Sequence, residues 1–454
     1  MRSNWALVVG LGLCLATSSA TNAAAQQAAS STVPAPSAED SALIARLTYP
    51  LEFNGKRISG PGLDKILEAS RNAQFVLLSE YLWHVDNATP AFAAALFREL
   101  HARNAFNYYA AEQDYLGAQQ VSRPPLRGDV QRIAAFVRRT PYALTFVNDE
   151  ELRLTAEVGR TSTGKWQPYW GFDQAFGATA PLEELRGLTT NANQRTAVDA
   201  LLSTARDIER PVPDFRDWRG IRDFETGHFI SRQSVALLPR LRSLRETFRP
   251  RPGSRAAELI DELYESALIY SYYARAGEKS TPEGVPVAWF NTSVRERAMR
   301  RHFMANYRNA QRLDGKLPKV LVKAGSKHLV EGRTPGNYTF PIGNFFHELA
   351  ASNGLEAVNV LMLPIQAGDG AKFEALPPEL QVLLVSKDVG KPTLVDLRPL
   401  RNHFHAGRMF GLSGQALPTF RDLVYGADFA LFLPSRMDTF VLIRALRVNS
   451  QTGP

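Results

Sequence analysis

Short runs of apolar, β-branched and aromatic residues recur along this chain and restrict its fold more than any other feature. Several are apolar throughout rather than alternating with polar residues, which is typical of strands covered on both faces. The expected strands are residues 75–78, 107–111, 168–172, 319–323, 357–363 and 427–433. Runs of this kind predict a mostly parallel sheet inside the protein.

Helical patterns lie between these runs. They cover residues 90–103, 128–139, 225–247, 255–276 and 293–311. Strands that alternate with helices predict an α/β fold, in which a mostly parallel central sheet is flanked by helices. No convincing strand interrupts residues 189–311, so we expect a helical insertion or cap there, with a lid over the site as its natural role. We expect a single domain over residues 41–454, because no second linker follows the N-terminal one.

The N-terminus has the features of an export signal. Arg2 is followed by a short apolar stretch and then by small residues that end in alanines, the order found in secretory signal peptides. We predict a cleaved signal peptide over residues 1–25, a flexible Ala/Ser/Pro linker over residues 26–40, and a periplasmic location. The single cysteine, Cys14, lies in the signal, so the exported chain would have no thiol nucleophile and no disulfide.

The charge balance indicates no nucleic-acid partner. The formal net charge is +8, which falls to +7 when Arg2 leaves with the signal, and this is a small excess for a chain of 454 residues. Six arginines repeat at helical spacing in residues 295–312, and we interpret them as a solvated helix face. No apolar run reaches the roughly 18 residues that an integral membrane helix needs. We expect a small-molecule substrate, and the sequence does not reveal an oligomeric state.

Three of the expected strands end in groups that can exchange protons. Glu80 ends the first and His84 follows it, Glu112 ends the second, and His328 follows the run 319–323. The carboxyl ends of parallel strands meet at one edge of a sheet, so we expect these four side chains to converge. Two carboxylates and two imidazoles at one edge predict a site for proton transfer.

The order of these motifs resembles the erythromycin esterase-like family, whose fold is shared with ChaN-like haem-binding lipoproteins and TIKI-type metalloproteases. The resemblance runs from about residue 75 to residue 433. It rests on the motifs already described and on two further segments, YWGFDQ at residues 169–174 and RERAMRRHFMAN at residues 295–306.

The family resemblance implies metal-independent hydrolysis of an ester or lactone, with no cofactor. It implies His84 as the general base that acts on water, Glu80 and Glu112 as its carboxylate partners, and His328 as the second imidazole. The candidates for substrate binding are Trp83, Asp173 and Arg297.

The first motif departs from the family pattern. The family has glycine before the glutamate and after the histidine, whereas this chain has Ser79 before Glu80 and Val85 after His84. The loss of both glycines removes backbone freedom where the chain bends around a substrate. The site is therefore either remodelled for another substrate or inactive.

Two other classes of function remain open at this stage. A ChaN-like protein would bind haem iron through histidine or tyrosine, and His84, Tyr108 and Tyr109 are available. A metal-dependent hydrolase or protease would use His84, Glu112 and His328 as ligands of a divalent metal.

Overall fold

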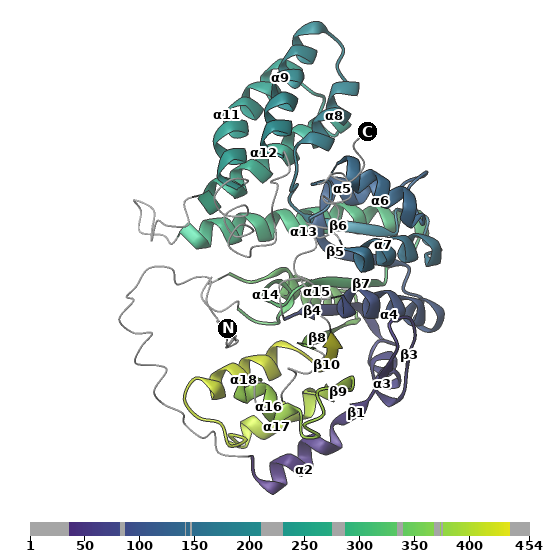
Figure 1. The fold of residues 1–454 in the computed structure, drawn as a ribbon, viewed down its shortest axis with the longest axis vertical. Helices are drawn as coiled ribbons and strands as arrows, with labels where there is room; N and C mark the ends of the chain where they lie inside the picture. Colours follow the sequence, from purple (N-terminus) through teal and green to yellow (C-terminus); the bar gives the residue numbers. More distant parts are fainter. Residues whose placement is uncertain are drawn as a thin grey trace, which may run out of the picture.

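The fold is known from a computed structural model that describes residues 36–81, 87–140, 142–145, 148–209, 230–274, 287–333, 339–366, 373 and 376–435. Within these residues the main sheet has eight strands in the order β1-β9-β10-β8-β4-β7-β5-β6 (Figure 1). The prediction of an α/β fold with a mostly parallel central sheet is confirmed. The expected signal peptide lies outside the described residues.

All six strands expected from the apolar runs are present. They are β4 (Ala73–Glu80), β5 (Tyr108–Asp114), β6 (Tyr169–Asp173), β7 (Val320–Gly325), β8 (Glu356–Gln366) and β10 (Phe429–Ser435). These six strands pair with one another in parallel. Their carboxyl ends therefore lie at one edge, which is the condition for the polar side chains at these ends to converge.

Four short strands were not expected from the sequence. β1 (Thr48–Pro50) pairs antiparallel with β9 (Thr393–Asp396), and β9 pairs antiparallel with β10, so the sheet is mixed at this side. β2 (Glu52–Phe53) and β3 (Ile58–Ser59) form a separate two-stranded sheet.

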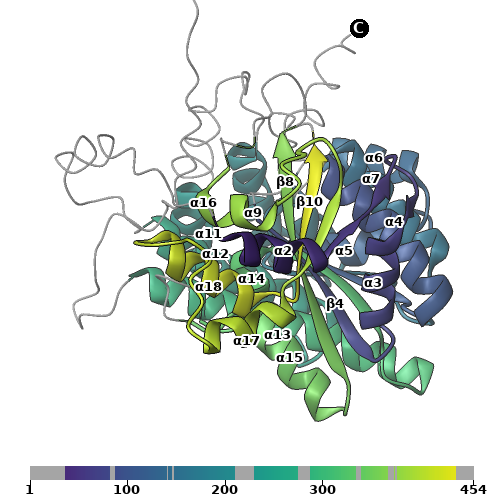
Figure 2. The same ribbon diagram turned by 90° about the horizontal axis from the view of Figure 1, so that it is seen from below.

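Helices cover both faces of the main sheet (Figure 2). One face packs against α3 (Pro61–Ala69), α4 (Ala88–Asn104), α6 (Val130–Arg139) and α7 (Asp149–Thr161). The opposite face packs against α13 (Val287–Asp314) and α15 (Ile342–Ser352). Aromatic side chains fill both layers because β5 and β6 place successive tyrosine and tryptophan side chains on alternate faces.

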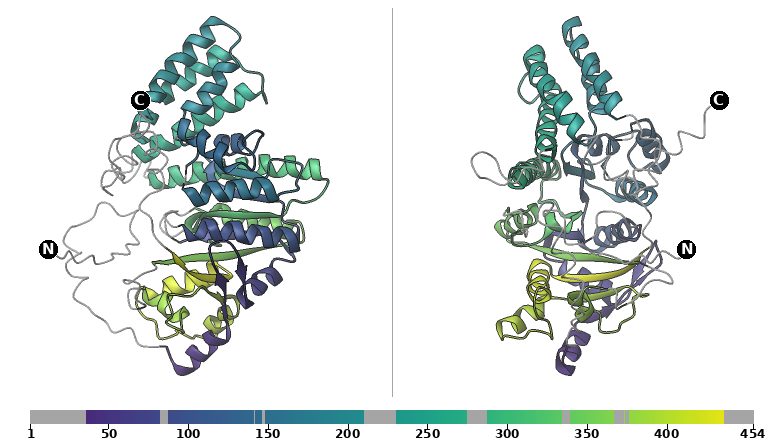
Figure 3. Two further views of the ribbon diagram at one scale, coloured as in Figure 1. Left: turned by 45° about the vertical axis from the view of Figure 1, so that its right-hand side comes forward. Right: turned by 60° about the vertical axis from the view of Figure 1, so that its left-hand side comes forward.

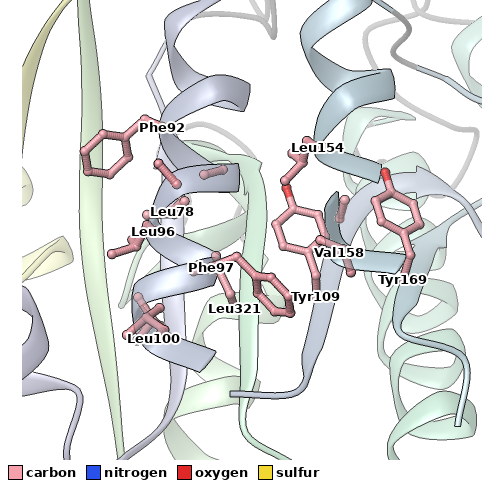
Figure 4. Close-up of a cluster of buried hydrophobic side chains, with 14 of the residues drawn as sticks. Leu78, Phe92, Leu96, Phe97, Leu100, Tyr109, Leu154, Val158, Tyr169 and Leu321 are labelled. Atoms are coloured by element: carbon pink, nitrogen blue, oxygen red, sulfur yellow. The ribbon is translucent and has the colours of Figure 1, made fainter. Parts of the chain in front are cut away.

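On the α4 and α7 face the core is built around a tyrosine pair (Figure 4). The rings of Tyr109 and Tyr169 stack with their centroids 5.5 Å apart, and Phe97 packs edge-on against Tyr109 at 6.3 Å. These three side chains are at most 2% exposed. Their burial fixes the adjacent strands β5 and β6, both of which carry site residues at their ends.

A further group of helices packs around the antiparallel side of the sheet. These are α2 (Ala38–Arg46), α16 (Pro378–Leu383), α17 (Arg398–His405) and α18 (Ala416–Gly426), and their apolar side chains form one core with β9 and β10. The first of them, α2, begins at Ala38, within the last residues of the segment expected as linker.

The helical cap stands beyond β6 (Figure 3). It contains α8 (Thr179–Gly187), α9 (Ala192–Ile208), α11 (Ile230–Phe248) and α12 (Arg255–Ala274), which share a core with α5 (Tyr115–Val121). α13 follows the cap in sequence and packs against both α12 and β6. Within the described residues, no helix is both long and apolar enough to span a membrane.

Candidate functional site

Glu112, near the end of β5, lies among charged groups from other elements. It is 5% exposed and lies on the α13 face, the same face as Tyr108 and Ala110. Its Oε2 accepts a hydrogen bond from the Gly325 amide at 2.8 Å, and its Oε1 accepts one from Nη2 of Arg295 at 2.6 Å. A carboxylate so buried needs such partners to remain charged.

Arg295, on α13, connects three carboxylate or amide side chains. Its Nη2 contacts Oδ2 of Asp173 at 2.5 Å, and its Nε donates to Oδ1 of Asp173 at 2.9 Å and to Oε1 of Gln174 at 3.0 Å. The planar guanidinium suits this two-bond contact with a carboxylate. Its side chain is only 14% exposed, so the interpretation of Arg295 as part of a solvated face is wrong.

A bulge interrupts the pairing of β5 and β6 where both carboxylates lie. Ala111 pairs with Gly171 and Asp114 pairs with Asp173, so β5 contains one residue more than β6 between these two pairs. Gly171 allows the strands to approach here, because a Cβ at this position would lie 2.3 Å from the carbonyl oxygen of Asp114. The extra residue changes the strand alternation locally.

His328 lies on α14 (Ser326–Leu329), directly after β7. Its Nδ1 lies 2.6 Å from Oε1 of Glu296, and the other oxygen of Glu296 accepts a hydrogen bond from the Ile342 amide at 2.7 Å. Donation from Nδ1–H to this carboxylate fixes the orientation of the ring and leaves Nε2 to face the other charges. Nε2 lies 3.2 Å from Nη1 of Arg295 and 3.5 Å from Oε1 of Glu112.

The charges around His328 favour its protonated form. Burial lowers the pKa of the imidazole, but the neighbouring carboxylates of Glu112 and Glu296 outweigh burial and the opposing charge of Arg295, so the pKa of His328 is raised above 6.5. When neutral, Nε2 accepts a hydrogen bond from Arg295. When protonated, it donates toward Glu112, so the ring has a partner in both states.

The end of α14 is held by a buried asparagine on β8. Asn359 is 1% exposed, and its Nδ2 donates to the carbonyl oxygens of Leu329 and Gly426, each at 2.9 Å. Its Oδ1 accepts a hydrogen bond from Ser79 at 2.5 Å. These contacts tie the helix that carries His328 to β4 and β8.

The structure thus brings together three of the residues singled out from the sequence, namely Glu112, His328 and Asp173, all within reach of Arg295. Arg297, predicted to bind substrate, is exposed on α13. His84 and Trp83 lie outside the described residues.

Glu80 belongs to a different group of charges. Lys323, in the middle of β7, donates to Oε1 of Glu80 at 3.0 Å and lies 2.5 Å from Oε1 of Glu151 on α7. Alternation along β4 and β7 places Glu80 and Lys323 on the α4 and α7 face, opposite to Glu112. Burial lowers the pKa of Lys323, but the two carboxylates outweigh it and raise the pKa above its usual range.

Five residues of these two groups were not predicted from the sequence, namely Arg295, Glu296, Gln174, Lys323 and Glu151. A signal existed for Lys323, since it is the single charge within the run VLVKAG. A second existed for Glu296, which occupies the buried side of a helix otherwise rich in arginine. Charged residues are rarely fully buried unless they are paired.

A cluster suitable for a cation lies between α12 and α13. Among the residues that the structure describes, Glu262, Glu265 and His302 have ligand atoms within 4.8 Å of one another. Arg301 already contacts both carboxylates there. The guanidinium thus supplies the positive charge that these acids require.

A surface hollow of about 710 Å³ lies on the cap, between α8 and α9. Two ion pairs cross its wall, Arg186 with Asp199 and Arg206 with Glu183. Among the described residues that line it, Leu202 alone is apolar, so they offer little surface for an apolar ligand.

Similarity to one solved structure supports the fold. A protein described by its role in succinoglycan biosynthesis is similar with a TM-score of 0.50 at 15% identity, over 88% of this chain and 98% of its own. A protein from Bacillus cereus has a TM-score of 0.49 at 12% identity, with the same coverage. A histidine-to-asparagine mutant of the erythromycin esterase EreC, in its open conformation, has a TM-score of 0.45 at 14% identity, over 83% of this chain and 95% of its own.

At such identities the likeness concerns the fold and not the activity. No protein-family profile matches the sequence. No curated protein matches it either.

Proposed function

We propose that this protein is an exported hydrolase that cleaves an ester or lactone, in the manner implied by its resemblance to the erythromycin esterase-like family. The observation that carries the proposal is the 2.6 Å contact between Nδ1 of His328 and Glu296. A carboxylate that orients a histidine, with the second ring nitrogen facing other polar groups, is a common arrangement for proton transfer.

In this proposal His84 accepts a proton from water, and the water oxygen attacks the carbonyl carbon. Nε2–H of protonated His328, which faces Glu112 when no substrate is bound, donates a hydrogen bond to the oxyanion that forms. The raised pKa of His328 favours this protonated form. When the carbon–oxygen bond to the leaving group breaks, the leaving alkoxide takes the proton from His84. His84 is then neutral again, and His328 has kept its proton throughout.

The remaining charges hold His328 in position. Arg295 lies between Nε2 of His328 and the carboxylates of Glu112 and Asp173. Because those carboxylates neutralise it, the guanidinium can stay close to the imidazole without preventing protonation. Asp173 and Arg295 thereby act on the ring through contacts that the structure describes directly.

The haem alternative receives little support from the two tyrosines proposed as ligands. Tyr108 and Tyr109 are both 0% exposed, and they face opposite sides of the sheet. Tyr108 stacks on Trp170 at 4.8 Å and donates to Asp314 at 2.6 Å. A single haem could not bind both hydroxyls without breaking the core.

The test is hydrolysis of a panel of p-nitrophenyl esters and lactones by the chain without residues 1–25, with and without a chelator. We expect turnover that survives chelation and falls by about 100-fold or more in His328→Asn and in His84→Ala, the usual range for loss of an acid–base group. His347→Asn is the matched control, since His347 lies on α15 and contacts Glu331 at 4.0 Å rather than the site charges.

Turnover that is lost on chelation would instead favour the metal-dependent hydrolase. Unchanged turnover in His328→Asn would remove this histidine from the reaction. No turnover by the parent chain on any substrate of the panel would contradict the proposed activity on simple esters and lactones.

A further inference from the structure

Helices α12 and α13 hold the backbone on either side of Asp173 and Gln174. His302, on α13, lies with Nδ1 3.1 Å from the carbonyl oxygen of Phe172, and Ser266, on α12, accepts a hydrogen bond from the Ala175 amide at 2.8 Å. A carbonyl oxygen can only accept, so Nδ1 of His302 carries the proton in this contact.

Glu262 joins these two contacts into one network. Its Oε2 lies 2.6 Å from Nε2 of His302, and Nη2 of Arg301 lies 2.8 Å from the same ring nitrogen. Its Oε1 accepts a longer hydrogen bond of 3.4 Å from Ser266. The side chains of Glu262, His302 and Ser266 are at most 3% exposed. The ring of Tyr115 stacks on the imidazole with centroids 4.3 Å apart and planes 10° from parallel, which restricts rotation of the ring.

A buried polar network lowers the stability of the fold unless each of its groups has a hydrogen-bond partner. The part of the backbone that this network contacts therefore points to its role. The network contacts the backbone immediately before Asp173 and immediately after Gln174. The side chains of these two residues supply both oxygens that accept the Nε–H of Arg295.

The rest of this loop has other anchors. The Phe176 amide donates to Asp114, and the amides of Ala178 and Thr179 donate to Glu209. The segment that depends on His302 and Ser266 is therefore residues 172–175, which is the part that sets the positions of the two acceptors of Arg295.

We propose that His302 and Ser266, joined by Glu262, are positioning residues through which the helical cap fixes Asp173, Gln174 and hence Arg295. The inference deepens the proposed function, because it rests on Arg295 and His328 forming the reactive site. The inference assigns α12 a role in that site. Among the described residues, the charges that face His328 come from elements other than α12.

The experiment measures Arg295 itself and needs no substrate. The exchange rate of its Nε–H with water is followed by nitrogen-15 NMR of arginine-labelled protein, well below the melting temperature, and the signal is assigned by its absence in Arg295→Lys. Ser266→Ala removes the acceptor of the Ala175 amide. His302→Phe keeps a ring for the stack with Tyr115 but removes the donor to Phe172.

We expect exchange to be about tenfold faster in each of these two variants, the size of effect typical for weakening one hydrogen bond to a charged group. Ser266→Thr and His302→Asn restore a hydroxyl and an N–H near the lost atoms, and we expect slow exchange in both. Glu265→Gln is the control, because Glu265 contacts Arg301 in the same cluster but not the backbone of residues 172–175.

Slow exchange retained in Ser266→Ala would overturn the proposal, and so would equal acceleration in Glu265→Gln, which would indicate general loosening of the cap. Absence of esterase turnover alongside the expected exchange pattern would refute the proposed function while leaving the positioning contacts established. The two failures are therefore distinguishable.

Discussion

Two groups of buried charges lie on opposite faces of one sheet, and they differ in how much of their side chains is exposed to solvent. Lys323 and its partners Glu80 and Glu151 have side chains that are 2% to 5% exposed. On the other face, the side chains of Arg295 and His328 are each 14% exposed. The first group is sealed within the core, whereas the second keeps an imidazole and a guanidinium at the border of the solvent. Similar ion pairing thus serves stability on one face and can serve chemistry on the other.

The largest expected effect is on stability, from Lys323→Met. This change leaves the carboxylates of Glu80 and Glu151 without their shared cation, so we expect a loss of about 3–5 kcal/mol in the free energy of unfolding. Urea denaturation at neutral pH measures it. Lys319→Met is the control, since this half-buried lysine before β7 donates to the carbonyl oxygen of Arg71 at 2.8 Å and lies over the Phe106 ring rather than between two carboxylates. A loss equal to that of the control would mean that the sealed group does not support the fold.

Arg295→Met should have the opposite profile, with a smaller effect on stability and a large one on activity. Water can reach this group in part, so we expect a loss of about 2 kcal/mol in the free energy of unfolding. Because the orientation of the acceptors around His328 depends on Arg295, we expect turnover to fall by about 100-fold or more.

Its matched control is Arg297→Met, two residues along the same helix and exposed. The sequence predicts substrate binding for Arg297 rather than Arg295, so the pair of variants decides between the two. Equal activity of both variants would mean that the partly exposed group around Arg295 and His328 does not serve chemistry, and the contrast with the buried group around Lys323 would fail.

The smallest effect concerns pH. The pKa of His328 is raised in the folded protein by Glu112 and Glu296, against the effect of burial. Its stabilising contribution is therefore fully present below the ordinary histidine pKa of 6.5 and is lost as the pH rises through the higher folded value. We expect His328→Asn to flatten the fall in stability above pH 6.5, as measured by thermal unfolding in a series of buffers. A steeper fall in the variant would contradict the direction of the shift.

The strands that build the site could be predicted from the sequence because they are continuous apolar runs that end in polar groups. The short strands β1, β2, β3 and β9 could not, since two to four residues carry no distinct pattern. The positions of Glu112 and His328 at strand ends followed from the rule for parallel sheets.

The partners in the site could not be predicted in the same way. Arg295 lies at the border of the buried stripe of α13, and its place in an arginine-rich series is typical of a solvated face. Its acceptor Asp173 is 122 residues away in sequence. Glu80 lies at a strand end like Glu112, but the alternation of side chains along the strand places it on the opposite face of the sheet. Which residues of a strand point to which face is known only when the packing of the sheet is known.

The bulge in β5 gives the position of the acidic groups an unusual dependence on chain length. Because one extra residue separates the pairs Ala111–Gly171 and Asp114–Asp173, removing Gln113 would let β5 and β6 pair without interruption while shifting every later residue of β5 by one place. Glu112 would keep its place and Asp114 would take the position of Gln113. In a lineage of such proteins, a single codon gained or lost here would change which acids face α13 while the same helices and strands were inherited.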